Sequence, residues 1–204
     1  MRRRHAMMRK IGLIALLPVL SLALLTGCGE LGRVDQGRVI AYDKEKGLVT
    51  IIADRNYADP KNPDYSILPP HVYRIPEKKS EMGPEPAVGK RMKLDMERKE
   101  IIIFDDATQD FKAIPITVID DRKGVEAEDP LVADKKFPLI DPEKKTITIY
   151  SRRLKHYVVF SVPEEDFKRP PETWIAGDEI RIYFKEKGKA LRLMNITKTD
   201  IFKK

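Results

Sequence analysis

The sequence predicts an all-β protein built as two tandem small antiparallel copies, each barrel-like or sandwich-like, with very little helix. Short stretches alternate between apolar and polar residues with a period of two, as in residues 91–96, which is typical of strands with one buried face. Turn-forming residues separate these stretches at short intervals. No long stretch has the 3.6-residue period of an amphipathic helix; only residues 164–169 suggest a single helical turn.

Residues 37–119 form the predicted first copy. It begins with a hairpin of two strands, 38–42 and 48–52, joined by a turn that ends at Gly47. Enrichment in Val, Ile and Thr supports the strand assignment. Further strands are expected at 72–75, 91–96, 101–104 and 111–119, the last placed at an edge or bulge by Pro115. Seven of the fifteen prolines fall between residues 59 and 86, which excludes helix from most of that segment.

Residues 138–204 form the predicted second copy, after an acidic connector at 120–137. Three blocks of the first copy recur in the same order, and the first pair has five identities in eleven: 42–52 with 140–150, 72–76 with 159–163, and 89–94 with 177–182. A duplication with an 11-residue insertion between Asp54 and Pro70 explains the three offsets of 98, 87 and 88. The alternative is that hairpins with Asp-x-Glu-Lys turns simply look alike.

The N-terminal segment predicts export. Residues 1–10 carry five basic and no acidic side chains, and residues 11–25 are mainly apolar, as in a signal peptide. The apolar run of 15 residues is shorter than the roughly 18–20 residues of a membrane-spanning helix. We therefore expect a signal peptide at 1–27, with translation starting at Met1, Met7 or Met8.

The only cysteine directly follows this segment. Leu25-Thr26-Gly27-Cys28 resembles the lipobox of bacterial lipoproteins. The resemblance implies a diacylglycerol on the Cys28 thiol, cleavage before Cys28, and acylation of the new amino terminus by a fatty acid such as palmitate. Two or more acyl chains anchor a protein stably to a bilayer. By the same resemblance, Gly29 in place of aspartate favours the outer membrane, facing the periplasm. The alternative is an ordinary secretory signal with a chance cysteine.

Composition limits the functional classes. The 177 residues from Cys28 onward contain 34 basic and 32 acidic side chains, so they lack the basic excess of a nucleic-acid binder. Acylation of Cys28 would leave no thiol for a disulfide or a cysteine-based metal site. We therefore expect no cofactor and no nucleic-acid partner. Residues 28–36 are predicted to be a short polar tether that keeps the domain close to the lipid bilayer.

The proline-rich insertion contains the candidate partner-binding residues, namely Asn56, Tyr57, Asn62 and Tyr65. A stiff loop with aromatic and amide side chains suits a peptide, glycan or envelope protein. The same loop could instead cover an open edge of a barrel. Both interpretations remain open from the sequence.

No catalytic set is assembled in the sequence. His71 and His156 lie at similar places in the two copies, but without the ligand spacing of a zinc site. The sole tryptophan, Trp174, is expected in the core.

The main hypothesis for the function is a non-catalytic binding or structural module. One alternative is a hydrolase acting on a glycan or peptide through carboxylates between the copies. Another is a metal or small-ligand site formed by the two histidines.

The order of motifs also resembles an uncharacterised family of bacterial lipoproteins that contains a domain of unknown function. Residues 59–65 (DPKNPDY) and 195–204 (NITKTDIFKK) carry the resemblance, which extends over most of the chain after Cys28. The resemblance implies a location and a fold, and it implies no activity.

Overall fold

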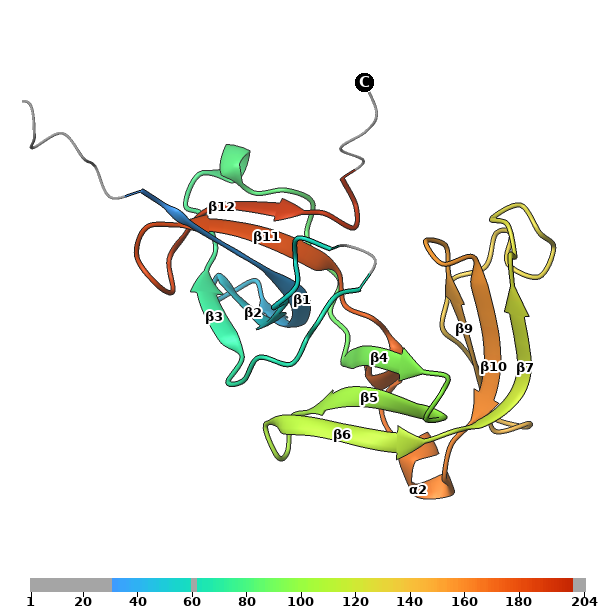
Figure 1. Ribbon diagram of the computed structural model, residues 1–204. Helices are drawn as coiled ribbons and strands as arrows, with labels where there is room; N and C mark the ends of the chain where they lie inside the picture. The colour runs from blue at the N-terminus through green and yellow to red at the C-terminus, as the bar shows by residue number, and fades with distance from the viewer. Residues whose placement is uncertain (1–30, 60–61, 200–204) are drawn as a thin grey trace, which may run out of the picture. The chain divides into compact units, whose positions relative to one another are not determined.

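The computed structural model describes residues 31–59 and 62–199 and confirms the all-β class (Figure 1). These residues form twelve strands in three antiparallel sheets, with the orders β12-β11-β1-β2-β3, β7-β10-β9-β8 and β4-β5-β6. The arrangement is sandwich-like and is not a closed barrel. The predicted signal peptide and Cys28 lie outside the described residues.

The five-stranded sheet contains the predicted first hairpin. Its strands are β1 (Arg33–Asp43), β2 (Leu48–Ala53), β3 (His71–Arg74), β11 (Glu179–Phe184) and β12 (Ala190–Asn195). β1 and β2 pair antiparallel from Asp43↔Leu48 to Gly37↔Ala53, and Gly47 in their turn has a φ of 63°, which glycine adopts without strain. β1 begins inside the predicted tether, because Gln36 is buried and its side chain bonds to Glu179 and Arg181.

The other two sheets contain the central part of the chain. The three-stranded sheet consists of β4 (Arg91–Asp95), β5 (Glu100–Asp105) and β6 (Asp110–Pro115). The four-stranded sheet consists of β7 (Thr117–Lys123), β8 (Leu139–Asp141), β9 (Thr146–Ser151) and β10 (His156–Ser161). The strand expected at 111–119 is thus two strands, and β7 continues into the expected connector. The helical segments are short: η1 (Lys79–Glu81), α2 (Glu164–Phe167) and η2 (Pro171–Trp174).

The sheets combine strands from both predicted copies. β11 and β12, from the second copy, extend the sheet of β1–β3, and β7, which begins in the first copy and ends in the connector, extends the sheet of β8–β10. The two copies therefore do not form separate sheets. Strands that are far apart in the sequence pair with each other in the same sheet. The duplication itself stays a prediction.

Three apolar clusters hold the sheets together. The first lies on the five-stranded sheet and includes Val39, Ile51 and Ile182. The second joins strands of the other two sheets around Trp174, which is fully buried, as expected. The third packs Met92 and Phe104 of the three-stranded sheet against Ile40 and Ile52. Burial of these side chains is the main favourable contribution to folding.

Candidate functional site

A groove lies between the two edge strands of the five-stranded sheet, and we call it the edge groove. Isolated β-bridges join Arg74, at the end of β3, to Lys189, just before β12, and Met82, in the segment after β3, to Leu193 on β12. Between the bridges, the seven residues 75–81 face the three residues 190–192. A cavity of about 730 Å³ lies between these two segments of unequal length and is lined by residues of both.

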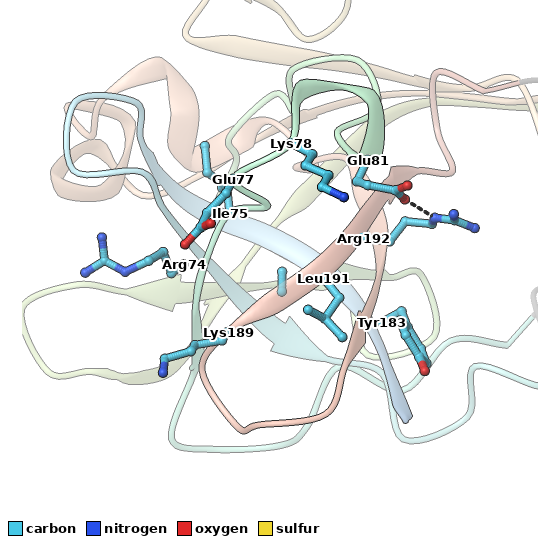
Figure 2. A pocket seen from close by; sticks show the side chains of 10 residues that line it. Arg74, Ile75, Glu77, Lys78, Glu81, Tyr183, Lys189, Leu191 and Arg192 are labelled. Atoms are coloured by element: carbon cyan, nitrogen blue, oxygen red, sulfur yellow. Dashed lines mark hydrogen bonds and ion pairs between the residues drawn. The ribbon is translucent and has the colours of Figure 1, made fainter. Parts of the chain in front are cut away.

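The edge groove combines an apolar floor with a charged rim (Figure 2). Leu191 and Tyr183 contribute to the floor and are 46% and 36% exposed. Large apolar side chains that remain exposed in a concavity are typical of a binding surface. The complete lining consists of Arg74, Ile75, Glu77, Lys78, Glu81, Tyr183, Lys189, Ala190, Leu191 and Arg192.

The rim carries more positive than negative charge. Figure 2 shows Glu81 and Arg192 reaching each other at one end of the groove, with Arg74 and Lys189 at the other end. The Nε atom of Arg192 donates a hydrogen bond to Oε2 of Glu81 at 2.5 Å. This bond lowers the pKa of Glu81 and raises the pKa of Arg192. Within the described ranges, no side-chain ion pair involves Arg74 or Lys78, so an anionic ligand group would find unneutralised cations here.

The predicted partner-binding residues lie elsewhere, in the loop between β2 and β3. Asn56 donates from Nδ2 to the carbonyl oxygen of Asn62, and Asn62 donates from Nδ2 to Oδ2 of Asp59, each at 2.8 Å. These amides therefore support the loop itself, although both residues are exposed. Tyr57 is 48% exposed, whereas Tyr65 packs against the third apolar cluster and its hydroxyl is buried. A binding role for these four residues stays a prediction.

The two histidines lie on different sheets, and each bonds to an aspartate. The Nδ1 atom of His71 on β3 lies 2.5 Å from Oδ2 of Asp35, which also accepts the hydroxyl hydrogen bond of Tyr73. The Nε2 atom of His156 on β10 lies 2.6 Å from Oδ1 of Asp121. In the part of the chain that the structure describes, no three His, Cys, Asp or Glu side chains gather as a metal site.

Sequence reasoning did not find the edge groove. Its two sides, residues 74–81 and 183–192, are about one hundred positions apart, and strand pairing brings them together. The available signal was local: Leu191 follows Ala190 and precedes Arg192, on a strand in which apolar and polar residues alternate imperfectly. The structure explains the irregularity, because a β-bulge between β11 and β12 shifts the register at this point.

The structure defines an all-β, sandwich-like domain, and comparison with known families identifies the family. The family model described as "Domain of unknown function (DUF4881)" matches residues 30–204. The chain therefore belongs to this family. No curated protein and no solved structure matches the chain. Within residues 31–59 and 62–199, no helix has the length and hydrophobicity needed to cross a membrane.

Proposed function

We propose that this protein is a lipid-anchored, non-catalytic binding module of the bacterial cell envelope, and that the edge groove receives its ligand. One observation carries the proposal: exposed Leu191 and Tyr183 share a single concavity with cations that lack ion-pair partners. Apolar contact would supply affinity, and the charged rim would fix orientation. No reacting group is needed for this role.

The shape and charge of the groove suit an extended, acidic segment of a partner protein. The groove runs along two sheet edges, where a peptide can lie extended beside a strand. An apolar side chain would contact Leu191 while carboxylates approach Arg74 and Lys78. Such charge-assisted hydrogen bonds are stronger than neutral ones. The ligand class is therefore an acidic peptide segment with at least one apolar side chain.

The position of Cys28 supports an anchoring role. Only residues 29–32 separate it from the start of β1 at Arg33. Because an extended residue spans at most about 3.6 Å, this spacer extends less than roughly 20 Å. An acylated Cys28 would therefore hold the domain close to the bilayer, where the groove would meet other envelope proteins.

Site-specific photocrosslinking tests the groove. A photoreactive phenylalanine analogue replaces Leu191 in the full-length protein, expressed in its native envelope. We expect a discrete crosslinked adduct, and we expect Arg74→Glu to reduce it strongly because the cationic end of the groove is reversed. The matched control places the same analogue at Ile119, which is 56% exposed on β7. An identical adduct pattern at both positions, or none at Leu191, contradicts the proposal.

Fractionation tests the anchor separately. The substitution Cys28→Ala removes the only thiol, so we expect the protein to move from the membrane to the soluble fraction and to lose labelling by an alkyne analogue of palmitate. Retention of Cys28→Ala in the membrane fraction would refute lipid anchoring, and it would leave the photocrosslinking result unaffected.

A further inference from the structure

A second cavity, of about 530 Å³, lies between β1, β4, β9 and β10, and we call it the arginine cleft. Its lining includes Arg38, Arg91, Lys93, Arg153 and His156. No Asp or Glu is among the lining residues in the described part of the chain. The cleft shares no lining residue with the edge groove, so it is a separate candidate site.

Neutral groups hold the two central arginines in place. Nη1 of Arg38 donates to the carbonyl oxygens of Arg91 and Met92 at 3.0 Å and 2.6 Å. The Arg38 guanidinium lies 4.1 Å from the centre of the Tyr65 ring, a stacking contact that fixes its plane. Nε of Arg91 donates to the carbonyl oxygen of Trp174 at 3.0 Å.

The partners in all of these contacts are uncharged. Within the described ranges, no carboxylate forms an ion pair with Arg38 or Arg91. The buried Nε atom of Arg38 has no hydrogen-bond partner. Burial, together with the charge of Arg38, lowers the pKa of Arg91 to about 9. Two partly desolvated like charges are unfavourable unless an anion lies between them.

Lys93 and His156 of the cleft differ in this respect. Lys93 donates from Nζ to Oδ2 of Asp95 at 2.8 Å, and His156 bonds to Asp121. Each of them has a carboxylate partner of its own, whereas Arg38 and Arg91 have none within the described ranges. Guanidinium groups bind tetrahedral oxyanions through paired N–H donors, which a single ammonium group cannot reproduce.

We propose that the arginine cleft binds a phosphate or sulfate group, either as the free ion or as the terminal group of a larger envelope molecule. Arg38 and Arg91 supply the charge and the N–H donors, and Lys93 adds a weaker attraction from the rim. This inference is independent of the edge groove, because it requires neither a peptide ligand nor a lipid anchor.

Ligand-dependent unfolding of the detergent-solubilised full-length protein tests this proposal. Inorganic phosphate and sulfate should raise the thermal midpoint with a saturable dependence, because a ligand that binds only the folded state stabilises it. Sodium chloride at equal ionic strength should not. Arg91→Met keeps an apolar stem but removes the charge, and it should weaken the apparent affinity about tenfold or more, as expected for a lost charge-assisted hydrogen bond. Arg122→Met on β7, where Arg122 pairs with Asp120, is the control and should leave affinity unchanged.

A second variant keeps the test decisive if Arg91→Met does not fold. Lys93 is exposed, so Lys93→Met should fold normally and still weaken anion binding by a few-fold. Glycerol 3-phosphate distinguishes the two sources of the ligand: tighter binding than inorganic phosphate indicates a terminal phosphate on a larger molecule, and weaker binding indicates the free ion. Equal midpoint shifts in wild type, Arg91→Met and Lys93→Met, or no saturable shift in wild type, would overturn the proposal.

Discussion

Gly89 and Gly177 lie in direct backbone contact at the point where the chain passes between sheets. A Cβ atom on Gly89 would lie 2.5 Å from the amide nitrogen of Gly177 and 2.3 Å from the carbonyl oxygen of Ile175. A Cβ atom on Gly177 would lie only 1.9 Å from the carbonyl oxygen of Val39. Backbone atoms cannot move aside cheaply, so only glycine fits at both positions.

The first prediction concerns this contact. Gly177→Ala should destabilise the protein by about 3 kcal/mol, the upper part of the range for overpacked sites, because the new methyl group meets backbone. Urea unfolding followed by circular dichroism measures the loss. Gly124→Ala is the control: nothing lies within 4 Å of its added Cβ, and only its φ of 76° is unfavourable, at a cost of about 1 kcal/mol. A smaller loss for Gly177→Ala than for Gly124→Ala would contradict the prediction.

The same two glycines show what the sequence could and could not reveal. They begin the aligned blocks 89–94 and 177–182, and the local pattern correctly placed the strand that follows Gly89. Period-two alternation and turn residues depend on nearby positions, so they can be read along the chain. Which strands share a sheet depends on contacts between distant positions. The pairing of β11 with β1, which brings β11 and β12 into the first sheet, therefore could not be predicted from local sequence patterns.

The candidate sites were harder to predict for the same reason. Tyrosine is a common residue type in binding loops, but Tyr65 packs against Arg38 and the third apolar cluster. Arg38 and Arg91 are 53 positions apart and look like ordinary surface charges in the sequence. Only the folded arrangement shows that neither has a carboxylate partner in the described part of the chain.

The second prediction concerns alkaline stability. The pKa of Tyr65 is raised from its ordinary value of 10.0 to about 12, mainly because the side chain is buried. The folded state therefore favours the neutral phenol, and this contribution is present below pH 10 and is lost as the pH rises from 10 to about 12. Tyr65→Phe should reduce the fall in stability across that window. Urea unfolding from pH 8 to 11.5 provides the measurement.

The matched control is Tyr57→Phe, which alters an exposed tyrosine of the same loop and should keep the wild-type profile. Because the hydroxyl of Tyr65 is buried without a hydrogen-bond partner, Tyr65→Phe should not lower stability at pH 7. A profile for Tyr65→Phe as steep as that of wild type would show that this phenol does not control alkaline stability.

The third prediction concerns acid stability and the edge groove. The hydrogen bond from Arg192 lowers the pKa of Glu81 below its ordinary value of 4.5. A carboxylate with a lowered folded-state pKa stabilises the fold above pH 4.5, and the contribution is lost as the pH falls below that value. Glu81→Gln should therefore show a shallower decrease of the thermal midpoint between pH 5 and pH 3.

Glu77→Gln is the comparison, since Glu77 also lines the groove but forms no side-chain ion pair within the described ranges. It should follow the wild-type curve through the same interval. High salt should reduce the difference between wild type and Glu81→Gln, because both partners are solvent-accessible and the pair is screened. Superimposable acid curves for the two variants at low salt would rule out a stabilising role for the Glu81–Arg192 pair.

The final prediction concerns Trp174, which joins the second apolar cluster to the arginine cleft. The ring is fully buried, its Nε1 atom has no hydrogen-bond partner, and its carbonyl oxygen accepts the hydrogen bond of Arg91. Trp174→Ala should cost about 3–5 kcal/mol because it leaves a large cavity. Trp174→Phe should cost clearly less, since it keeps an aromatic ring and removes an unsatisfied donor.

Circular dichroism in urea must report both losses of stability, because Trp174 is the only tryptophan and both variants lose its fluorescence. Leu154→Ala, at a side chain that is 57% exposed, should change stability by less than about 0.5 kcal/mol. Equal losses for the alanine and phenylalanine variants would mean that the unpaired indole nitrogen and the ring volume do not determine stability at this position.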